Sequence, residues 1–170
     1  CIPRGIQRPR IAAETRRPRG TVHPMQQGPL FLGIDIGTSG TKCVLIDTTG
    51  AVVAEATVEH PVSYPQPGWA EQDPEDWWTS TVAAVTRACA TQPGSAPRVE
   101  AIGLSGQMHG LVTLDAHGEV VRPCILWNDS RSTAICERLH AREPGLATVL
   151  RTTGNRVFPG FQAPKLLWMR

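Results

Sequence analysis

The sequence predicts a mixed α/β domain that begins with three antiparallel strands and continues with parallel strands and helices. Runs of β-favouring residues at 30–36, 41–47 and 51–59 are joined by segments too short for parallel crossovers. An amphipathic helix pattern comes next. It is long enough to return the chain for a parallel strand at 98–104. These two observations together define a mixed sheet.

The first three strands are expected to form a meander. The first, at 30–36, is rich in β-favouring residues and is followed by glycines, while the second, at 41–47, alternates apolar and polar side chains. Residues 48–50 (Thr-Thr-Gly) predict a turn into the third strand at 51–59. A loop rich in Pro and Gly at 60–72 then separates the meander from the helix.

Helix signals begin at Asp73, a candidate N-cap, and at Pro74, which suits the first helical position. Two acidic residues in the first turn complement the helix dipole. Apolar residues recur at helical spacing and predict the buried stripe, which comprises Trp78, Val82, Val85 and Cys89. The segment 92–97 ends the helix.

Beyond the helix the pattern is less regular. We expect the fourth strand at 98–104, a glycine-bounded loop at 105–110, a fifth strand at 111–115 and a short apolar run at 124–127. Helices are then expected in three places: from an Asn128 or Asp129 cap to about Arg142, after Pro144, and from Pro164 onward.

This order of elements, βββαβ followed by further strands and helices, matches a ribonuclease-H-like domain. Actin-type ATPases and sugar kinases share that architecture, as do several nucleases. The fold therefore does not fix the function.

Composition excludes several function classes. The 170 residues are 41% hydrophobic and 19% charged, which indicates a globular chain of one domain, or one domain and a tail. No run reaches the ~20 apolar residues of a membrane-spanning helix, and none near the start resembles a secretory signal. We therefore expect no membrane partner.

The net charge of +2 is unevenly distributed. Residues 1–24 hold six arginines and one acid, a net +5, whereas residues 25–170 carry −3. We expect 1–24 to be a disordered, non-native basic leader, with Met25 the natural start of a domain covering 25–170. The alternative is a basic arm for nucleic acid or an organelle transit peptide. Since the domain itself is mildly acidic, no nucleic-acid partner is expected.

Five cysteines, an odd number without CxxC spacing, predict neither a disulfide framework nor a metal cluster. Three of them stand within apolar stretches, where free cysteine behaves as a small hydrophobe. We expect a reducing, cytoplasmic location.

The segment 33–42, GIDIGTSGTK, predicts a phosphate-binding turn between two strands. It matches neither a Walker A loop nor a dinucleotide fingerprint. Glycines let backbone N–H groups approach an anion, and hydroxyls and a lysine add donors. The predicted cofactor-binding residues are Gly37, Thr38, Ser39, Gly40, Thr41 and Lys42. Asp35 would hold magnesium through water. The alternative is an ordinary polar turn.

Two further segments predict a grip on a sugar. Gln107, Met108 and His109 follow the fourth strand, and parallel strands present ligand groups at their C-terminal ends. The segment 127–131 offers an aromatic ring and hydroxyl-binding groups. Alternatively, His109 is a solvated surface residue, Trp127 belongs to the core and Asp129 only caps a helix. The motif GWAEQDP at 68–74 either lines the same cleft or anchors the long loop.

Five segments together resemble the N-terminal half of FGGY carbohydrate kinases. They read LGIDIGTSGTK, GWAEQDPEDWW, AIGLSGQMHG, ILWNDSR and FPGFQAPKLLW, in order over residues 29–170. The combination of GQMHG with LWNDSR is the most specific part, and it is most similar to the bacterial xylulokinases. The phosphate turn is shared by all actin-type ATPases.

The resemblance implies ATP-dependent phosphorylation of a sugar, D-xylulose to D-xylulose 5-phosphate. Asp35 is similar to the aspartate that supports magnesium and phosphates, and the first phosphate loop includes Thr38, Ser39 and Lys42. The implied substrate contacts are Met108 and His109, then Trp127, Asn128 and Asp129, with Gln107 and Arg131 added by extension. The alternatives are another FGGY kinase, acting on ribulose, gluconate, glycerol or another polyol, and a non-catalytic sugar-binding domain.

The resemblance also implies that half of the active site lies elsewhere. In the family the general base is an aspartate in a region beyond residue 170, and a second domain holds adenosine. We therefore expect this chain to be a truncated sugar-binding domain that is inactive alone. A homodimer of the full-length protein is compatible with the resemblance.

Overall fold

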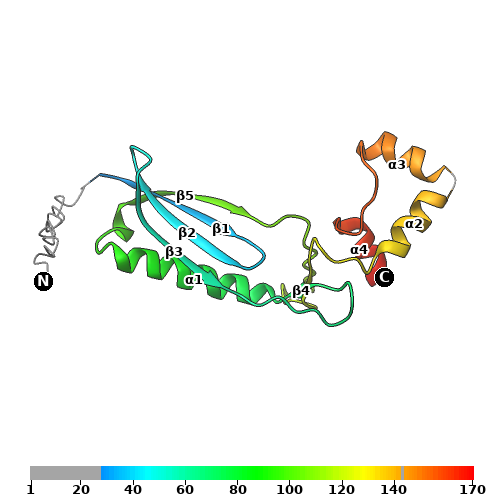
Figure 1. Ribbon diagram of the computed structural model, residues 1–170, viewed down its shortest axis with the longest axis horizontal. Coiled ribbons are helices and arrows are strands. Elements are labelled where there is room, and N and C mark those ends of the chain that lie inside the picture. The colour runs from blue at the N-terminus through cyan, green and yellow to red at the C-terminus, as the bar shows by residue number, and fades with distance from the viewer. Residues whose placement is uncertain (1–27, 143) are drawn as a thin grey trace, which may run out of the picture.

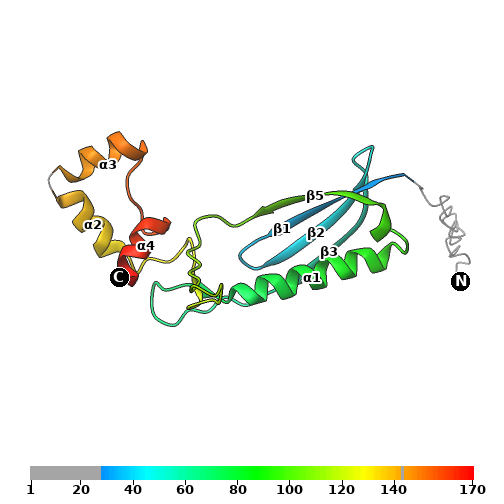
Figure 2. The same cartoon turned by 180° about the vertical axis from the view of Figure 1, so that it is seen from behind.

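The computed structural model describes residues 28–142 and 144–170. The predicted leader at 1–24 and the predicted start at Met25 lie outside the described residues. A sheet with its covering helix α1 occupies one end of the molecule, and the helices α2, α3 and α4 occupy the other (Figure 1). Figure 2 shows the same arrangement from behind, again with the sheet and α1 at one end and α2, α3 and α4 at the other.

The main sheet confirms the predicted mixed topology. Its strands are β1 (Leu30–Ile36), β2 (Gly40–Asp47), β3 (Val52–Glu59) and β5 (Val99–Gly106), in the order β3-β2-β1-β5. The first three pair antiparallel as a meander, and β5 pairs parallel to β1. Because the parallel pair runs in one direction, β1 and β5 end at the same edge of the sheet.

Helix α1 (Pro74–Thr91) begins where the sequence predicts. The Asp73 carboxylate accepts a hydrogen bond from the Glu75 N–H, and Pro74 takes the first turn, where it removes no helical hydrogen bond. The helix packs on β2 and β3, and Ala84 and Ala88 join the apolar core that the sheet supplies. After α1 a short 3₁₀ turn (Ala96–Arg98) leads into β5.

The predicted buried stripe of α1 is wrong in part. Trp78 and Val82 are 64% and 47% exposed, while the buried residues of the helix are small: Ser80, Thr81, Ala84 and Ala88. Small side chains let the helix lie close to the sheet, so the large residues are displaced to its flank. The other two predicted members, Val85 and Cys89, are partly buried against the core.

Strand β5 is exposed along most of its length. Ile102 and Leu104 stand in register with the buried residues Leu32 and Ile34, so they face the same side of the sheet as α1. They remain 60% and 77% exposed because α1 packs mainly on β2 and β3.

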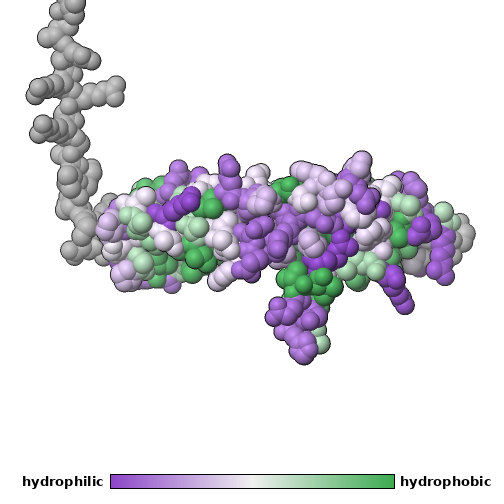
Figure 3. Space-filling model, turned by 90° about the horizontal axis from the view of Figure 1, so that it is seen from below, coloured by the Kyte–Doolittle hydropathy of each residue, from purple (hydrophilic) through white to green (hydrophobic). Residues whose placement is uncertain are grey.

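From below, the surface is a mosaic of apolar and hydrophilic patches with one projecting arm (Figure 3).

A second, two-stranded sheet connects the two ends of the molecule. The unpredicted strand β4 (Glu71–Gln72) pairs antiparallel with β6 (Cys124–Ile125). The predicted strand at 111–115 is wrong. Within the described residues, that segment makes isolated bridges, Leu111 with Ile125 and Leu114 with Val120, and forms no continuous strand.

Three helices complete the fold: α2 (Thr133–Ala141), α3 (Gly145–Thr153) and α4 (Gln162–Met169). The predicted N-cap of α2 at Asn128 or Asp129 is wrong, since the helix begins after Ser132. Asp129 is engaged by other partners, described below. Helix α3 begins after Pro144, as predicted. Among the described helices, none combines the length and the apolar character needed to cross a membrane.

Candidate active site

The common edge of β1 and β5 carries a cavity of about 430 Å³. Segments far apart in the sequence meet there: the end of β1, the turn after it, the loop after β5 and the segment after β6. The lining residues are Asp35, Gly37, Thr38, Gly106, Gln107, Met108, His109 and Trp127. Apart from Gly106, every one of them belongs to the predicted site, so the structure brings the predicted phosphate-binding turn and the loop after β5, predicted to bind a sugar, together.

Hydrogen bonds join the turn to the loop directly. The Thr38 hydroxyl donates to Gln107 Oε1 at 3.1 Å and accepts from the indole N–H of Trp127 at 3.1 Å. Three predicted ligand-binding side chains are therefore partly committed to one another. Thr38 and Gln107 shape the cavity through these bonds.

Gln72 stands behind this contact and is 2% exposed. Its Nε2 donates to the backbone carbonyl of Thr38 at 2.7 Å and to that of Pro61 at 3.0 Å. Its Oε1 accepts from Gln107 Nε2 at 2.9 Å and from Trp77 Nε1 at 3.0 Å. A glutamine amide has two donor protons and a two-lone-pair oxygen, so its capacity is fully used. Gln72 thus holds the turn and the loop at a fixed spacing.

The loop residues most open to a ligand are Met108 and His109. The Met108 side chain is 69% exposed at the cavity, so its apolar surface is available for packing. His109 has φ of 62°, and among the described residues no other non-glycine residue has positive φ. Its imidazole ring lies 4.9 Å from the ring of Phe161. A backbone in this region is disfavoured for a residue with a side chain, so the surrounding structure must hold it.

The turn itself is built differently from the prediction. The Gly37 N–H donates to the Gly40 carbonyl at 3.0 Å, and a Cβ on Gly40 would lie 2.7 Å from the Val58 carbonyl oxygen. Gly40 is therefore required by packing against β3. Thr41 is completely buried and bonds the Ser80 hydroxyl, so its own hydroxyl lies away from the cavity. Ser39 is exposed at the tip.

Asp35 and Lys42 are paired in the register of β1 and β2. They also line a shallow groove of about 340 Å³ on the face opposite α1, whose lining includes Gly33 and Gly103. The exposed Asp35 carboxylate makes no hydrogen bond or ion pair within residues 28–142 and 144–170. Lys42 forms a surface ion pair with Glu55 at 2.9 Å. Asp35 borders both the groove and the main cavity, so it stands between them.

The structure does not place Asp129 and Arg131 in the cavity. The Asp129 carboxylate accepts from the Ala70 N–H at 2.7 Å and from Arg131 Nη2 at 2.7 Å. Arg131 also contacts Glu71, with 2.6 Å between Nη1 and Oε1, and its guanidinium lies 3.7 Å from the centroid of the Trp69 ring. Both charged side chains are at most 1% exposed. They tie β4, the segment after β6 and the Trp69 loop together.

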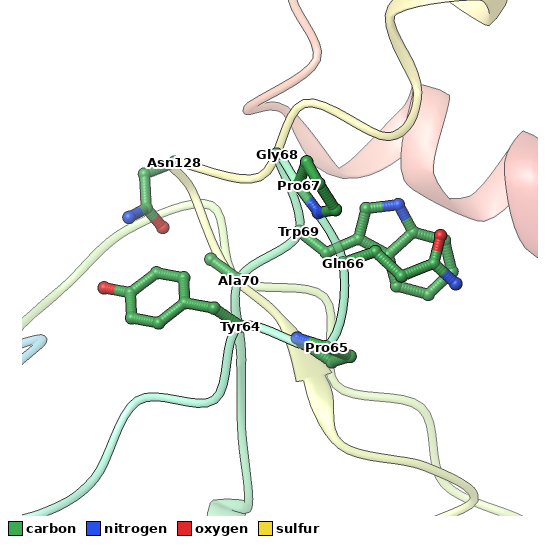
Figure 4. Close-up of a pocket in the computed structure, with 8 residues that line it drawn as sticks. All are labelled: Tyr64, Pro65, Gln66, Pro67, Gly68, Trp69, Ala70 and Asn128. Carbon is green, nitrogen blue, oxygen red and sulfur yellow. The ribbon is translucent and has the colours of Figure 1, made fainter.

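Asn128 and its neighbour Trp127 line different cavities. Asn128 lines a separate cavity of about 540 Å³, formed mainly by the proline-rich loop from Tyr64 to Ala70. In Figure 4 the Asn128 amide lies on the same side as the Tyr64 ring, while Trp69 points to the opposite side, toward the helices. Trp69 packs edge-on against Trp168 of α4, with ring centroids 5.2 Å apart. The predicted second sugar segment is therefore divided between two cavities and a buried ion network.

Two residues with structural control over the cavity were not predicted as part of the site. Gln72 belongs to the motif GWAEQDP, which is expected either to line the cleft or to anchor the long loop, and the residue is not among the predicted site residues. Lys165 was not singled out, although it donates to the His109 carbonyl at 2.8 Å. The available signal was its rarity, since it is one of two lysines in the chain and stands among apolar residues of PKLLW.

The sheet order and its strand-end cleft define the class of protein: a domain with the ribonuclease-H-like fold of actin-type ATPases. A family model described as "FGGY family of carbohydrate kinases, N-terminal domain" matches residues 30–170. The chain therefore belongs to the FGGY family of carbohydrate kinases.

Known relatives agree with this assignment. The chain is 48% identical over 141 residues to the xylulose kinase of Escherichia coli, a match covering 83% of the chain and 28% of that protein. Among solved structures, xylulose kinase from Rhodospirillum rubrum is 35% identical with a TM-score of 0.77. Gluconate kinase from Lactobacillus acidophilus is 28% identical with a TM-score of 0.75. These two matches cover 82% and 83% of this chain, and 28% of each structure's chain.

Proposed function

We propose that the protein carrying this chain transfers a phosphoryl group from ATP to a sugar hydroxyl, with D-xylulose as the substrate and D-xylulose 5-phosphate as the product. The observation that carries the proposal is the shared cavity, in which Asp35 and the turn at Thr38 meet Met108 and His109. A phosphate donor and a polyol acceptor need such adjacent sites, since phosphoryl transfer depends mainly on positioning and charge neutralisation.

In this proposal Met108 packs on the carbon atoms of the sugar, and the imidazole of His109 and the free N–H of Gln107 bond its hydroxyls. The Trp127 ring, half exposed at the cavity, covers one side of the sugar. The buried state of Asp129 and Arg131 and the separate cavity of Asn128 favour a supporting role for these three. They would hold the Trp127 segment in place.

Asp35 fits a magnesium ion bound mainly by water and by ATP phosphate oxygens. Mg²⁺ in such sites takes one or two carboxylates and keeps several waters. No three His, Cys, Asp or Glu side chains gather as a metal cluster in the described parts of the chain, so a single carboxylate is the local donor. The ion would neutralise charge on the transferred phosphoryl group. Exposed Ser39 and the nearby Lys42 are the proposed phosphate contacts.

We place the general base and the adenosine site outside this chain, in a second domain. Among the residues that the structure describes, Asp35 is the only carboxylate that lines the main cavity, and it is already assigned to magnesium. The chain also spans 28% of the length of the E. coli relative. We further propose that the whole protein is cytoplasmic and forms a homodimer. The free thiols of Cys43, Cys89, Cys124 and Cys136 favour a reducing compartment.

A substrate panel on the full-length protein carrying this chain tests the proposal. ADP formation is measured with D-xylulose, D-ribulose, D-gluconate and glycerol, and D-xylulose should give the highest kcat/KM. The 170-residue chain alone should show no turnover. A preference for gluconate would identify another FGGY specificity. Sugar binding without ADP formation by the full-length protein would favour a non-catalytic domain.

The Asp35→Ala variant tests the assigned division of roles. Turnover should fall by a factor on the order of 10²–10³, as when one electrostatic group is removed from an active site. Sugar affinity, measured by calorimetry, should change little, because Asp35 is assigned to the phosphates. The Asp35→Asn variant separates the charge from the shape of the side chain. An equal loss of sugar affinity would contradict the role.

A further inference from the structure

Lys165 of α4 is the largest fully buried side chain among the described residues, with 0% exposure. Lysine is almost never fully buried unless it is paired. Here the partners are two backbone carbonyls. The ammonium donates to the His109 oxygen at 2.8 Å and to the Gly160 oxygen at 2.7 Å. The described part of the chain supplies no carboxylate within ion-pair distance. Burying the ammonium without a carboxylate partner costs desolvation free energy, which the hydrogen bonds to the two carbonyls must offset.

One of the two carbonyls belongs to the strained residue of the cavity. His109 has a positive φ, and its carbonyl oxygen accepts the hydrogen bond from the Lys165 ammonium. Gln162 of the same helix donates from Nε2 to the next carbonyl, that of Gly110, at 3.0 Å. Helix α4 therefore anchors two successive peptide groups of the sugar loop.

The other carbonyl, that of Gly160, connects the same lysine to a segment that packs against the Trp127 backbone. Gly160 lies so close to the segment after β6 that a Cβ there would be 2.4 Å from the Trp127 carbonyl oxygen. Lys165 holds Gly160 at this position. The ammonium thus links the His109 carbonyl to Gly160, which packs against the Trp127 backbone, and the side chains of His109 and Trp127 both line the cavity.

The electrostatic surroundings are finely balanced. Burial lowers the pKa of Lys165 to about 8, while the nearby Cys124 and Asp129 raise it and Arg131 lowers it further. The lysine is therefore largely charged at neutral pH. Charge-assisted hydrogen bonds to carbonyls are about twice as strong as neutral ones, so the charge strengthens the hold on both peptide groups.

We propose that Lys165 is a positioning residue that fixes the backbone of His109 against Trp127 and thereby sets sugar affinity. The inference about affinity rests on the proposed function of the cavity, whereas the inference about the loop backbone does not. Lys165 acts through His109 and makes no contact with the reacting atoms.

The test compares Lys165→Met, which keeps the length but removes the donor, with Lys165→Gln, which keeps a neutral donor. In the full-length protein the sugar KM of Lys165→Met should rise about tenfold, the scale of one lost charge-assisted bond. The ATP KM should stay within about twofold, and Lys165→Gln should recover part of the loss. A general loss of stability would not separate the two KM values in this way.

Ser132→Ala is the matched control. The Ser132 hydroxyl is buried and donates to the Pro159 carbonyl at 3.2 Å, so its loss perturbs the same connecting segment without touching His109. This variant should lower stability while leaving the sugar KM unchanged. A rise in sugar KM equal to that of Lys165→Met would overturn the proposal.

Amide hydrogen exchange of residues 106–111 gives a readout that does not depend on any sugar. Exchange there should be at least several-fold faster in Lys165→Met than in the wild type, and unchanged in Ser132→Ala. Unchanged exchange in Lys165→Met would overturn the inference. Faster exchange in a protein that binds no sugar would instead overturn the proposed function and leave the backbone role standing. Faster exchange with an unchanged sugar KM would refute the link to affinity.

Discussion

The turn after β1 and the segment after β6 border the same cavity, yet they use their charged groups in opposite ways. Beside the turn, the Asp35 carboxylate is exposed and has no partner among the described residues, and the Lys42 side chain is half exposed in a surface pair with Glu55. After β6, Asp129 and Arg131 are sealed against Glu71 and Trp69. The charged groups of the first region are exposed to solvent, whereas those of the second are buried in contacts with other protein groups.

This difference shows how the cavity is made rigid. An exposed charged side chain can be aimed at a ligand only if buried, hydrogen-bonded groups hold its backbone in place. The buried ion network, the fully bonded Gln72 amide and the Lys165 ammonium provide that support from behind. The polar residues near the cavity therefore fall into an exposed layer and a buried supporting layer.

The largest expected effect separates these layers at Asp129. Asp129→Ala removes the acceptor of the buried Ala70 N–H and breaks the buried ion pair with Arg131, which keeps only Glu71 as a carboxylate partner. Breaking a buried pair costs about 3–5 kcal/mol, so the free energy of unfolding should fall by that amount in urea titrations. Asp115→Ala is the control, since that carboxylate also accepts backbone N–H groups but in an exposed turn. A stable Asp129→Ala protein with weakened sugar binding would return Asp129 to the sugar contacts.

A smaller effect is expected at Gln72, which supports both ligand segments at once. Gln72→Leu leaves the Trp77 indole N–H and the Gln107 amide short of an acceptor, at about 1–3 kcal/mol for a buried unsatisfied group. In the full-length protein the KM values for sugar and ATP should rise together, since turn and loop lose their common anchor. Gln66→Leu, at an exposed position in the proline-rich loop, should change neither. A change in only one KM would show that the two segments are positioned independently.

Local sequence signals predicted the elements whose causes are local. The meander follows from alternation and short turns, and the start of α1 follows from Asp73 and Pro74. The lining of the cavity could be predicted where strand ends bring residues together, at the turn and at Gln107, Met108 and His109.

The errors fall where distant residues decide the outcome. The sequence predicts Asp129 as a possible cap of α2, yet that helix begins after Ser132 and the Asp129 carboxylate accepts a hydrogen bond from Ala70, 59 residues away. The stripe of α1 was misplaced because small Ala84 and Ala88, not Trp78, set the distance to the sheet. Local periodicity predicts neither the distant partner of a buried charge nor the distance between a helix and the sheet it covers.

The pH dependence of stability sharpens the view of the buried layer. The pKa of Lys165 is about 8 in the fold against 10.5 ordinarily, so between these values the unfolded chain binds a proton that the folded chain lacks. The unfolding free energy must then rise with pH, by at most about 1.4 kcal/mol per pH unit for one proton. Burial raises the pKa of Cys124 from 9.0 to about 11, which works in the opposite direction above pH 9.

The clean window is therefore pH 8 to 9. Wild-type unfolding free energy should rise there by roughly 1 kcal/mol relative to Lys165→Met. Parallel urea titrations at the two pH values provide the measurement. Identical pH slopes for the two proteins would show that the ammonium is not desolvated in the folded state.

The smallest expected effect tests the exposed layer at Lys42. Its ion pair with Glu55 has side chains 50% and 57% exposed, and such pairs contribute about 0–1 kcal/mol to stability. Lys42→Met should therefore barely change the unfolding free energy. Because Lys42 lines the same groove as Asp35, the variant should still raise the ATP KM of the full-length protein a few fold.

Glu55→Gln breaks the same pair from the other side and leaves the lysine in place. If Lys42 serves the phosphates, Glu55→Gln should leave the ATP KM unchanged or slightly lower, because the ammonium is released from its competitor. Equal increases in both variants would assign Lys42 to the strand surface alone. The charge that is available at the turn would then be reduced to Asp35, and the phosphates would depend on magnesium and on backbone donors for their attraction.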